Sequence, residues 1–362
     1  MGQSNVFQFV CSQNCDRALG MGGFSLDNPP SRGRDRAIVV VWSEIRGWLD
    51  YLTPSFVSRA IETCDTECVF TSDRELLTKA NAVLFHGPTH KGRNAGFPPK
   101  RPVGVDYVFA NLEPITYKNV QTLVRDKQFM STFDLTMTYE QTSDVPLGYV
   151  GSSSTSKYFK APKSSFEEKD GFGFPDAIAA FVSNCKAAGA TERVAYMEEL
   201  MKHATVHSFG YCLHNRREMP KLVPGDEAAV RQENKVEVLR HYKFLLAFEN
   251  NNKLSDYVTE KVYNGLQSGT LPVYWGAENV EDFIPRGSVV KASDFSSPAE
   301  LGRHLKMLAA DEEAYESYFK WREDPEEEKR FEEIISRSAY GVNAMCRLCD
   351  RVLHKDKTGH GR

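Results

Sequence analysis

Short apolar runs alternate with helix-like stretches along this chain, and this alternation constrains the fold more than any other feature. In the first half, strands are predicted over residues 37–42, 82–85, 107–110 and 135–138. Such runs are typical of parallel strands that are buried on both faces. Strands that alternate with helices form a parallel sheet with right-handed crossovers. The first half therefore predicts an α/β domain.

The alternation restarts in the second half of the chain. Strands are predicted over residues 177–182, 206–209, 244–248 and 271–275, with helices over residues 192–203, 231–239 and 258–268. A chain of 362 residues is too long for one ordinary core. We therefore expect two Rossmann-like domains, residues 36–150 and 174–345, after a flexible segment of residues 1–35. Residues 151–173 are rich in Ser, Lys, Gly and Pro, and they predict a linker.

Composition and charge exclude several classes of protein. The net charge is -4, and no basic stripe carries interleaved aromatic residues, so we expect no nucleic-acid partner. No stretch approaches the ~20 apolar residues of a membrane span. The first residues also lack the basic start and apolar run of a signal peptide. A membrane contact would therefore need an anchor that is not visible in this sequence.

The eight cysteines fall mostly in local pairs: Cys11 with Cys15, Cys64 with Cys68, Cys346 with Cys349, and Cys185 and Cys212 flanking one segment. Thiolates at such spacing can converge on a zinc ion. They can equally form disulfides in an oxidising compartment. Spacing alone leaves both interpretations open.

Polar residues are concentrated between a predicted core strand and a predicted core helix, in the stretch FENNNKLSDYVTEK of residues 248–261. A helix N-terminus attracts anions, and Lys261 adds a full positive charge in its first turn. Asp256 and Glu260 could simply cap this helix. Capping does not explain Asn250, Asn251, Asn252 and Tyr257, whose donors, acceptors and aromatic face suit a sugar-nucleotide. No specific role is assigned to Asn251 and Asn252, which could simply shape the loop.

Three further residues lie at positions where α/β sheets bind ligands. His86 and Glu113 follow predicted strands, and Arg193 opens the helix after the strand that ends near Ser183. A guanidinium there can reach a pyrophosphate, although a lone arginine is more often a surface residue. Partial burial at Glu113 would suit a general base, and an ordinary exposed loop carboxylate is an equal alternative.

Several catalytic motifs are absent from the sequence. No two aspartates stand at D-x-D spacing, and there is no P-loop, G-x-S-x-G elbow or H-E-x-x-H motif. An enzyme that acts on a nucleotide-sugar without such a metal-chelating motif would stabilise the departing diphosphate with Lys, Arg and a helix dipole.

At these residues the chain resembles glycosyltransferase family 10, the α1,3/4-fucosyltransferases. The resemblance covers residues 38–350 and is carried by three stretches: FDLTMTYEQTSDVPLGY of residues 133–149, FVSNCKAAGATERVAYMEEL of residues 181–200, and the block from YKFLLAFENNN to VEDFIP of residues 242–285. The elements SNC, GYCLHNR, SDVPLGY and CRLC are most similar to the plant and invertebrate type that acts on the N-glycan core.

The resemblance implies a GT-B fold, in which two Rossmann-like domains with parallel sheets face each other across a cleft. The N-terminal domain would bind the acceptor and the C-terminal domain GDP-fucose. The CxxC tail of residues 346–362 would pack back on the N-terminal domain. It further implies disulfides that join Cys64 and Cys68 to Cys346 and Cys349, and Cys185 to Cys212. By resemblance, the enzyme would lie in the Golgi lumen or membrane.

The resemblance also implies roles for the site residues. Glu113, in NLEP, would be the base of an inverting transfer, and His86 would face the acceptor. Donor-binding roles fall to seven residues: Ser183, Arg193, Glu249, Asn250, Tyr257, Glu260 and Lys261. The family requires no metal cofactor, and stimulation by Mn2+ or Mg2+ stays open.

Three functions follow as hypotheses. The first is α1,3-transfer of fucose from GDP-fucose to N-acetylglucosamine of glycoprotein N-glycans, with the core residue as the favoured acceptor. The second is Lewis-type α1,3/4-fucosylation of terminal N-acetyllactosamine. The third is an inactive module that binds a sugar-nucleotide without turnover.

Overall fold

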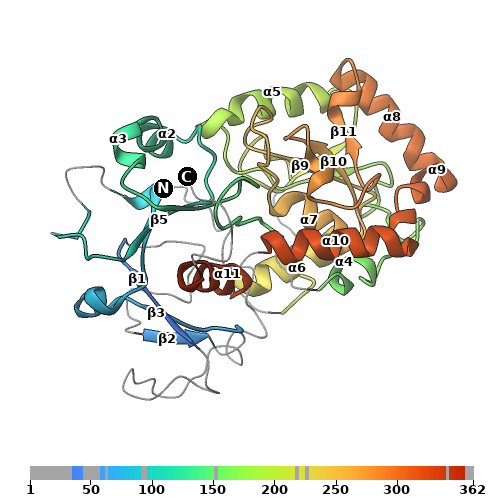
Figure 1. The fold of residues 1–362 in the computed structure, drawn as a ribbon. Helices are drawn as coiled ribbons and strands as arrows, with labels where there is room; N and C mark the ends of the chain where they lie inside the picture. Colours follow the sequence, from blue (N-terminus) through green and yellow to red (C-terminus); the bar gives the residue numbers. More distant parts are fainter. Residues whose placement is uncertain are drawn as a thin grey trace. The chain divides into compact units, whose positions relative to one another are not determined.

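The computed structural model describes residues 35–43, 58–61, 64–90, 96–98, 100–150, 154–216, 220–224, 228–339 and 342–354 (Figure 1). The chain divides into two compact units. The first, here the N-terminal unit, comprises Gln3–Gly148 together with Ser338–Arg362, and the second, the C-terminal unit, comprises Tyr149–Arg337. The predicted flexible segment of residues 1–35, including Cys11 and Cys15, lies almost wholly outside the described residues.

The N-terminal unit contains a six-stranded sheet in the order β2-β3-β1-β4-β5-β6. All neighbouring pairs are parallel except β2 with β3, which is antiparallel. The strands are β1 (Arg36–Val41), β2 (Ser58–Ile61), β3 (Glu67–Thr71), β4 (Ala82–His86), β5 (Asp106–Asn111) and β6 (Leu135–Thr138). The four predicted strands of the first half are thus confirmed, and β2 and β3 were not predicted.

Helices connect these strands and cover the sheet. They are η2 (Arg74–Lys79), η3 (Gly87–Thr89), α2 (Lys118–Arg125), α3 (Lys127–Met130) and the distant α11 (Val342–Leu353). On one side of the sheet, aromatic rings pack together around Phe85, with Phe129 and Phe133 inserted from the α3 region. This aromatic core holds β4 and β5, and therefore the segments that follow them.

Helix α11 returns to the N-terminal unit from the far end of the chain and packs on β1 and β3. Two disulfides fix it there, Cys64–Cys346 and Cys68–Cys349. The pairing implied by the family resemblance is therefore confirmed, and the zinc interpretation is wrong for these four cysteines because their sulfurs are bonded to each other. The helix begins before residue 346, so the tail that packs on this unit is longer than predicted.

The C-terminal unit contains a five-stranded, fully parallel sheet in the order β11-β10-β9-β7-β8. The strands are β7 (Ile178–Ala180), β8 (Val206–Ser208), β9 (Phe244–Phe248), β10 (Leu271–Trp275) and β11 (Val290–Lys291). All four strands predicted in the second half are present, although β7 and β8 are shorter than expected. Apart from the antiparallel β2, the sheets of both α/β units are parallel, which confirms the Rossmann-like architecture.

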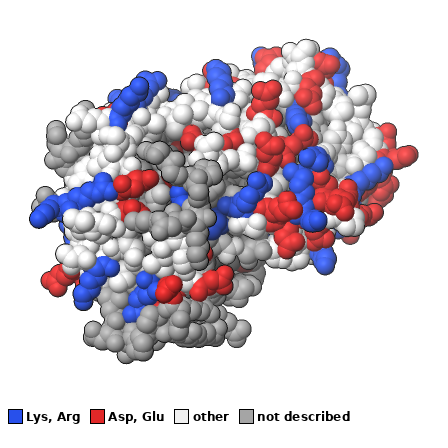
Figure 2. Space-filling view, viewed as in Figure 1, with Lys and Arg blue, Asp and Glu red and all other residues white. Residues whose placement is uncertain are grey.

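Helices cover both faces of the C-terminal sheet (Figure 1). They are α4 (Ser156–Phe159), η4 (Ala187–Gly189), α5 (Ala190–Leu200), α6 (Ala228–Arg240), α7 (Glu260–Ser268), η5 (Val280–Asp282), η6 (Ala292–Asp294), α8 (Pro298–Ala310), α9 (Glu312–Ser317), η7 (Lys320–Glu323) and α10 (Pro325–Ser338). Helices α5 and α8 belong to the core on one face, whereas α6 packs on the other. Over α8 to α10, acidic and basic side chains are interspersed on the face shown in Figure 2.

The stretch of residues 151–173, which the sequence predicts as a linker, is packed into the C-terminal unit. Tyr158 and Phe159 of α4 are buried against Phe331. Lys169 is also buried, and its ammonium donates to the Gly269 carbonyl oxygen at 2.7 Å and the Tyr315 hydroxyl at 3.2 Å. Buried anchors of this kind are incompatible with a free linker. The polar composition misled the prediction because Lys169, a polar residue of this stretch, is buried and binds a backbone carbonyl.

No helix among the described residues is long and apolar enough to cross a membrane.

Candidate active site

The carboxyl ends of β7 and β9 form the centre of a candidate active site in the C-terminal unit. The chain passes from β7 to β8 on one side and then returns to β9 on the other side of β7. At such a switch point the two crossovers diverge, which leaves a crevice where α/β proteins bind ligands. Arg193 joins the two strand ends, because its guanidinium donates to the carbonyl oxygens of Phe248 at 2.9 Å and Asn184 at 2.5 Å.

Arg193 is only 1% exposed, so the interpretation of it as a surface residue is wrong. Burial lowers the pKa of its guanidinium, while Glu249 opposes that shift. Two of its nitrogens bind backbone carbonyls, and its buried Nε has no partner among the described residues. In this structure Arg193 therefore holds two strand ends together, and its contact with a diphosphate stays a prediction.

Glu249 organises the N-terminus of α7. It follows β9 directly, is 0% exposed, and accepts hydrogen bonds from the Thr259 N–H at 2.7 Å and the Thr259 hydroxyl at 2.6 Å. Its carboxylate also accepts from the Lys261 ammonium at 3.1 Å. A carboxylate at a helix N-terminus is favoured by the helix dipole. Glu249 therefore holds Thr259, the N-cap residue of α7 ten residues downstream, whereas Asp256 bonds with Asn279 instead.

Lys261 lies between two carboxylates. Besides Glu249, its ammonium contacts Glu260 at 3.3 Å and donates to the Thr259 hydroxyl at 2.6 Å. Burial alone would lower the pKa of Lys261, but Glu249 and Glu260 raise it above its usual value. Burial raises the pKa of Glu249. At Glu260 burial also acts to raise the pKa, but Lys261, Lys235 and hydrogen bonds together outweigh it and lower the pKa. We call Arg193, Glu249, Glu260 and Lys261 the charged cluster.

The loop from Asn250 to Tyr257 closes over the strand ends. The Asn251 amide oxygen accepts from the Lys253 N–H at 2.8 Å, and its amide nitrogen reaches the Ala188 carbonyl oxygen at 3.4 Å. The loop approaches Gly189 so closely that a Cβ there would lie 2.7 Å from Asn251 Nδ2. Asn251, to which the sequence assigned no role, therefore shapes the loop. The predicted donor role of Asn250, at its start, stays a prediction.

Tyr257, near the end of this loop, is buried in the C-terminal unit. Its ring packs edge-on against Tyr149, with ring centroids 6.2 Å apart. This packing fixes the end of the loop just before α7. The predicted contact of Tyr257 with a sugar-nucleotide is not tested by this arrangement.

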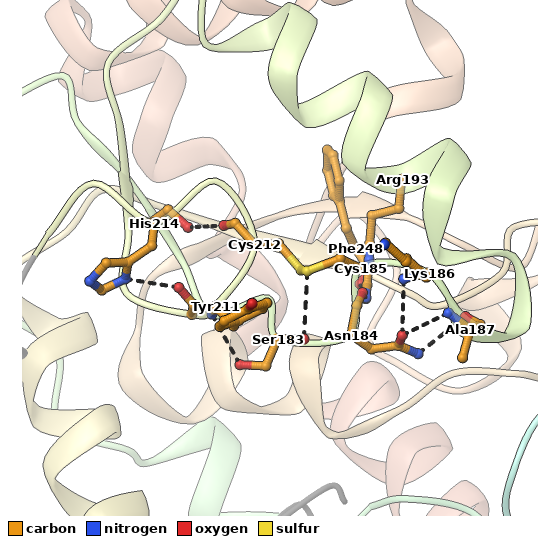
Figure 3. The surroundings of a disulfide bond; sticks show 12 residues. Ser183, Asn184, Cys185, Lys186, Ala187, Arg193, Tyr211, Cys212, His214 and Phe248 are labelled. Carbon is orange, nitrogen blue, oxygen red and sulfur yellow. Dashed lines mark hydrogen bonds between the residues drawn. A yellow bond between two sulfur atoms is a disulfide. The ribbon is translucent and has the colours of Figure 1, made fainter. Parts of the chain in front are cut away.

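The Cys185–Cys212 disulfide, which the resemblance implied, joins the loops after β7 and β8 (Figure 3). In the first loop, the Asn184 side chain accepts a hydrogen bond from the Ala187 N–H at 3.0 Å. This contact holds the Asn184 backbone carbonyl, which accepts a hydrogen bond from Arg193. The Ser183 hydroxyl accepts from the N–H of the exposed Tyr211 at 3.4 Å. Ser183 therefore belongs to this stapled loop, and its donor contact stays a prediction.

Glu113 lies in the N-terminal unit, two residues after β5, and is half-buried. The side chain of Asn111, which is 1% exposed, binds the Glu113 backbone twice: its amide oxygen accepts from the N–H at 3.1 Å, and its amide nitrogen donates to the carbonyl oxygen at 2.7 Å. Burial, and secondarily Glu113, raise the pKa of Tyr117. The carboxylate thus lies near a phenol in a backbone turn that Asn111 defines.

His86 ends β4 in the same unit and is 4% exposed. Its Nδ1 lies 3.0 Å from the Thr89 hydroxyl, so its ring is held in the turn formed by η3. This burial leaves little of the ring accessible, and the predicted acceptor contact of His86 stays a prediction.

Both units match sequence models of one family. Residues 34–150 match "Fucosyltransferase, N-terminal", and residues 175–360 match "Glycosyltransferase family 10 (fucosyltransferase) C-term". The chain belongs to glycosyltransferase family 10. It is therefore a fucosyltransferase by family, which confirms the resemblance stated from the sequence.

Individual relatives agree with this assignment. The fucosyltransferase is 32% identical over 290 residues to the human "4-galactosyl-N-acetylglucosaminide 3-alpha-L-fucosyltransferase 9", across 79% of this chain and 70% of that protein. It is 29% identical over 313 residues to the "GDP-fucose protein O-fucosyltransferase 3" of Xenopus tropicalis, across 80% of this chain and 63% of that protein. These relatives differ in the acceptors that their names give.

Solved structures support the fold. A crystal structure of an α1,3-fucosyltransferase aligns with a TM-score of 0.53 and 19% identity, covering 82% of this chain and 84% of that chain. A second, an α1,3-fucosyltransferase with GDP-fucose, aligns with a TM-score of 0.50 and 16% identity, covering 93% of this chain and 96% of that one. The expected GT-B class is thereby confirmed.

The structure of the fucosyltransferase groups the predicted site residues within each unit. Arg193, Glu249, Glu260 and Lys261 are brought together at the switch point. Sequence reasoning missed three residues of these regions: Asn111, Thr259 and Lys235 of α6, which faces Glu260 and Lys261. Asn111 stands two residues before Glu113, and this spacing is a signal for an Asx-type contact with the backbone. Lys235 carries no such local signal.

Proposed function

We propose that this fucosyltransferase transfers L-fucose from GDP-fucose, in α1,3 linkage and with inversion, to N-acetylglucosamine of glycoprotein N-glycans. The core N-acetylglucosamine is the acceptor that we favour. The observation that carries the proposal is the Lys261 ammonium held by Glu249 and Glu260 at the N-terminus of α7, at the switch point of a parallel sheet. A positive charge at a helix N-terminus is a phosphate site.

On the donor side, Lys261 binds the diphosphate of GDP-fucose. Arg193, on α5, also contacts the diphosphate, and its buried Nε lacks a partner among the described residues. Asn250, Tyr257 and Glu260 contact the ribose, the fucose or the base, and Ser183 and Glu249 complete the pocket. Because these groups are held before the donor arrives, they stabilise the charge of the leaving GDP without reorganising.

On the acceptor side, Glu113 acts as the general base. It removes the proton from the 3-hydroxyl of N-acetylglucosamine, and the oxygen attacks the anomeric carbon of fucose. A new carbon–oxygen bond forms as the bond between that carbon and the β-phosphate oxygen breaks. Inversion follows because the attack comes from the face opposite the leaving GDP, which departs with the bonding electron pair.

Three sequence motifs support core N-acetylglucosamine as the acceptor. They contain Cys185, Cys212 and the CRLC stretch of residues 346–349, and they resemble the plant and invertebrate type. The printed name of the human relative instead specifies a 4-galactosylated N-acetylglucosamine. Terminal N-acetyllactosamine is therefore the second candidate acceptor. The three disulfides between described residues suit an oxidising lumen, in agreement with the Golgi location that we propose.

An acceptor panel tests the proposal. Purified protein is incubated with GDP-fucose and either a core glycopeptide, N-acetyllactosamine or an unglycosylated peptide, and released GDP and product linkage are measured. Faster α1,3-transfer to the core glycopeptide supports the proposal. Faster transfer to N-acetyllactosamine would favour the second candidate, and transfer to the bare peptide would favour protein O-fucosylation. GDP-fucose binding without turnover on any acceptor would leave the inactive module as the function.

A further inference from the structure

Lys235 is a lysine of α6 that the sequence did not single out and that lies beside the donor region. Its side chain is half-buried, and its ammonium lies 5.0 Å from the centroid of the Phe181 ring. Phe181 follows β7 at the carboxyl edge of the sheet and stacks on Phe209, which follows β8, with ring centroids 5.1 Å apart. The contact therefore places the ammonium at the edge where the candidate active site lies.

The packing of α6 explains why the lysine reaches this edge. The helix connects β8 to β9, so it starts at the carboxyl edge and runs back along the sheet. Its neighbour is α7, and the Gln232 amide nitrogen donates to the Asn264 amide oxygen at 2.5 Å. Long helical side chains lean toward the N-terminus of their own helix. Lys235, one turn after Gln232, therefore leans toward the carboxyl edge.

Counting charges, the region around Lys235 holds one more cation than carboxylates, and Lys235 interacts with Glu260 without forming an ion pair with it. In the charged cluster, two carboxylates, Glu249 and Glu260, balance the charges of Arg193 and Lys261. Among the described residues, no carboxylate forms an ion pair with Lys235. The Glu260 Oε2 atom, in turn, is buried with no hydrogen-bond partner in the described part of the chain. Lys235 therefore adds one net positive charge to a site that already holds paired charges.

We propose that Lys235 is a third cation of the donor site, which attracts and positions the diphosphate of a nucleoside-diphosphate sugar. The inference rests on the proposed function and extends it to a residue on a different helix. Glu249 and Glu260 already offset the positive charge of Lys261. Lys261 alone therefore cannot neutralise the negative charge of a diphosphate. A cation that no carboxylate holds in an ion pair is attracted to the negative charge of the diphosphate and stabilises GDP as it leaves.

The proposal has a consequence for pH. Burial lowers the pKa of Lys235 to about 8, with Glu260 opposing the shift and Lys261 adding to it. These two residues are the charged groups that face it from α7, and the segment after β7 presents the uncharged Phe181. Because the lysine loses its proton as the pH rises through this value, GDP affinity of the free protein should fall from about pH 7 to about pH 9.

The test is calorimetric titration of GDP into the full chain at about pH 7 and about pH 9. Lys235→Met should weaken GDP binding roughly tenfold at the lower pH and abolish the pH dependence. Lys235→Arg should bind GDP well at both pH values, because arginine stays charged. Lys202, an exposed lysine that pairs with Glu199, supplies the matched control, and Lys202→Met should behave as the unsubstituted protein.

Two results would overturn the inference alone. One is wild-type affinity for GDP in Lys235→Met at both pH values. The other is an equal loss of GDP affinity in Lys235→Met and Lys235→Arg, together with a GDP affinity of the unsubstituted protein that does not change with pH. That pattern would mean that Lys235 acts through packing rather than through its charge. Thermal unfolding of each variant separates lost binding from lost folding. A wild-type chain that binds no GDP at either pH would overturn the proposed function itself, and this inference with it.

Discussion

The loop after β9 and the turn after β5 occupy equivalent places, at the carboxyl ends of parallel strands in two different sheets. Their chemistry is different. The loop after β9 leads into buried charges that neutralise each other, since Glu249 and Glu260 hold Lys261. The turn after β5 is held by two neutral hydrogen bonds from one amide, Asn111 to Glu113.

This difference suits two different tasks. Charges that hold each other in a fixed place can receive an anion without moving. A base, in contrast, must take a proton on its carboxylate, and Asn111 fixes the position of Glu113 through its backbone. Substitutions in the two regions should therefore change different kinetic constants.

The largest effect is expected at Glu113. Glu113→Gln keeps the shape of the side chain but removes the base, so kcat should fall by roughly 10²–10⁴-fold. GDP affinity, measured by calorimetry, should change by less than about 0.5 kcal/mol, as for substitutions away from a binding site. Equal losses in turnover and in GDP affinity would contradict the separation of the two regions.

A smaller effect on a different quantity is expected at Lys261. Lys261→Ala should weaken GDP binding by about 1.5–3 kcal/mol, the range for hydrogen bonds to charged groups. The substitution also leaves the buried Glu249 without its cation, so the midpoint of denaturant unfolding should fall. Lys253→Ala is a control, because this lysine lies in the same stretch but is exposed and pairs with Glu192. Unchanged GDP affinity in Lys261→Ala would remove Lys261 from the donor site.

Asn111 tests whether backbone support matters for the base. Asn111→Ala removes both hydrogen bonds to the Glu113 backbone, and kcat should fall by about tenfold, as for the loss of about 1.4 kcal/mol. The KM for GDP-fucose should stay constant, because none of the proposed donor-binding residues lies in the turn after β5. Full activity in Asn111→Ala, together with an inactive Glu113→Gln, would show that the turn keeps its shape without the amide.

The smallest effect is a pH dependence of the free energy of unfolding, which we expect from a histidine in the sheet that carries the charged cluster. In β8, His207 is buried, and its Nδ1 lies 2.9 Å from the Tyr242 hydroxyl. Burial, and then Arg216, lower the pKa of His207 to about 4. Because this value lies below the ordinary pKa of about 6.5, the stabilisation is present above about pH 6.5 and is lost as the pH falls toward about 4.

Between about pH 7 and about pH 6, the free energy of unfolding should decrease by about 0.7 kcal/mol. Denaturant unfolding at both pH values measures this change, and His207→Gln should remove it. A decrease of the same size in the His207→Gln variant would assign the effect to other groups.

Much of the fold could be predicted because it depends on local pattern. Buried parallel strands are continuous apolar runs, and every predicted strand is present in the structure. The turn after β5 could also have been predicted from the sequence, because Asn111 and Glu113 are two residues apart. Sequence placed Lys261 in the first turn of α7 for the same reason, since helix starts have local signals.

The tertiary structure alone decided the contacts between residues distant in sequence. Four paired cysteines allow three connectivities, and only the packing of α11 on β1 and β3 selects Cys64–Cys346 with Cys68–Cys349. Arg193 and Phe248 are 55 residues apart, and Lys235 reaches the site from a neighbouring helix. The sequence thus determined which elements form and which residues begin or end them. How the charges of those residues neutralise each other depends on distances that arise only when the sheet brings its strand ends together.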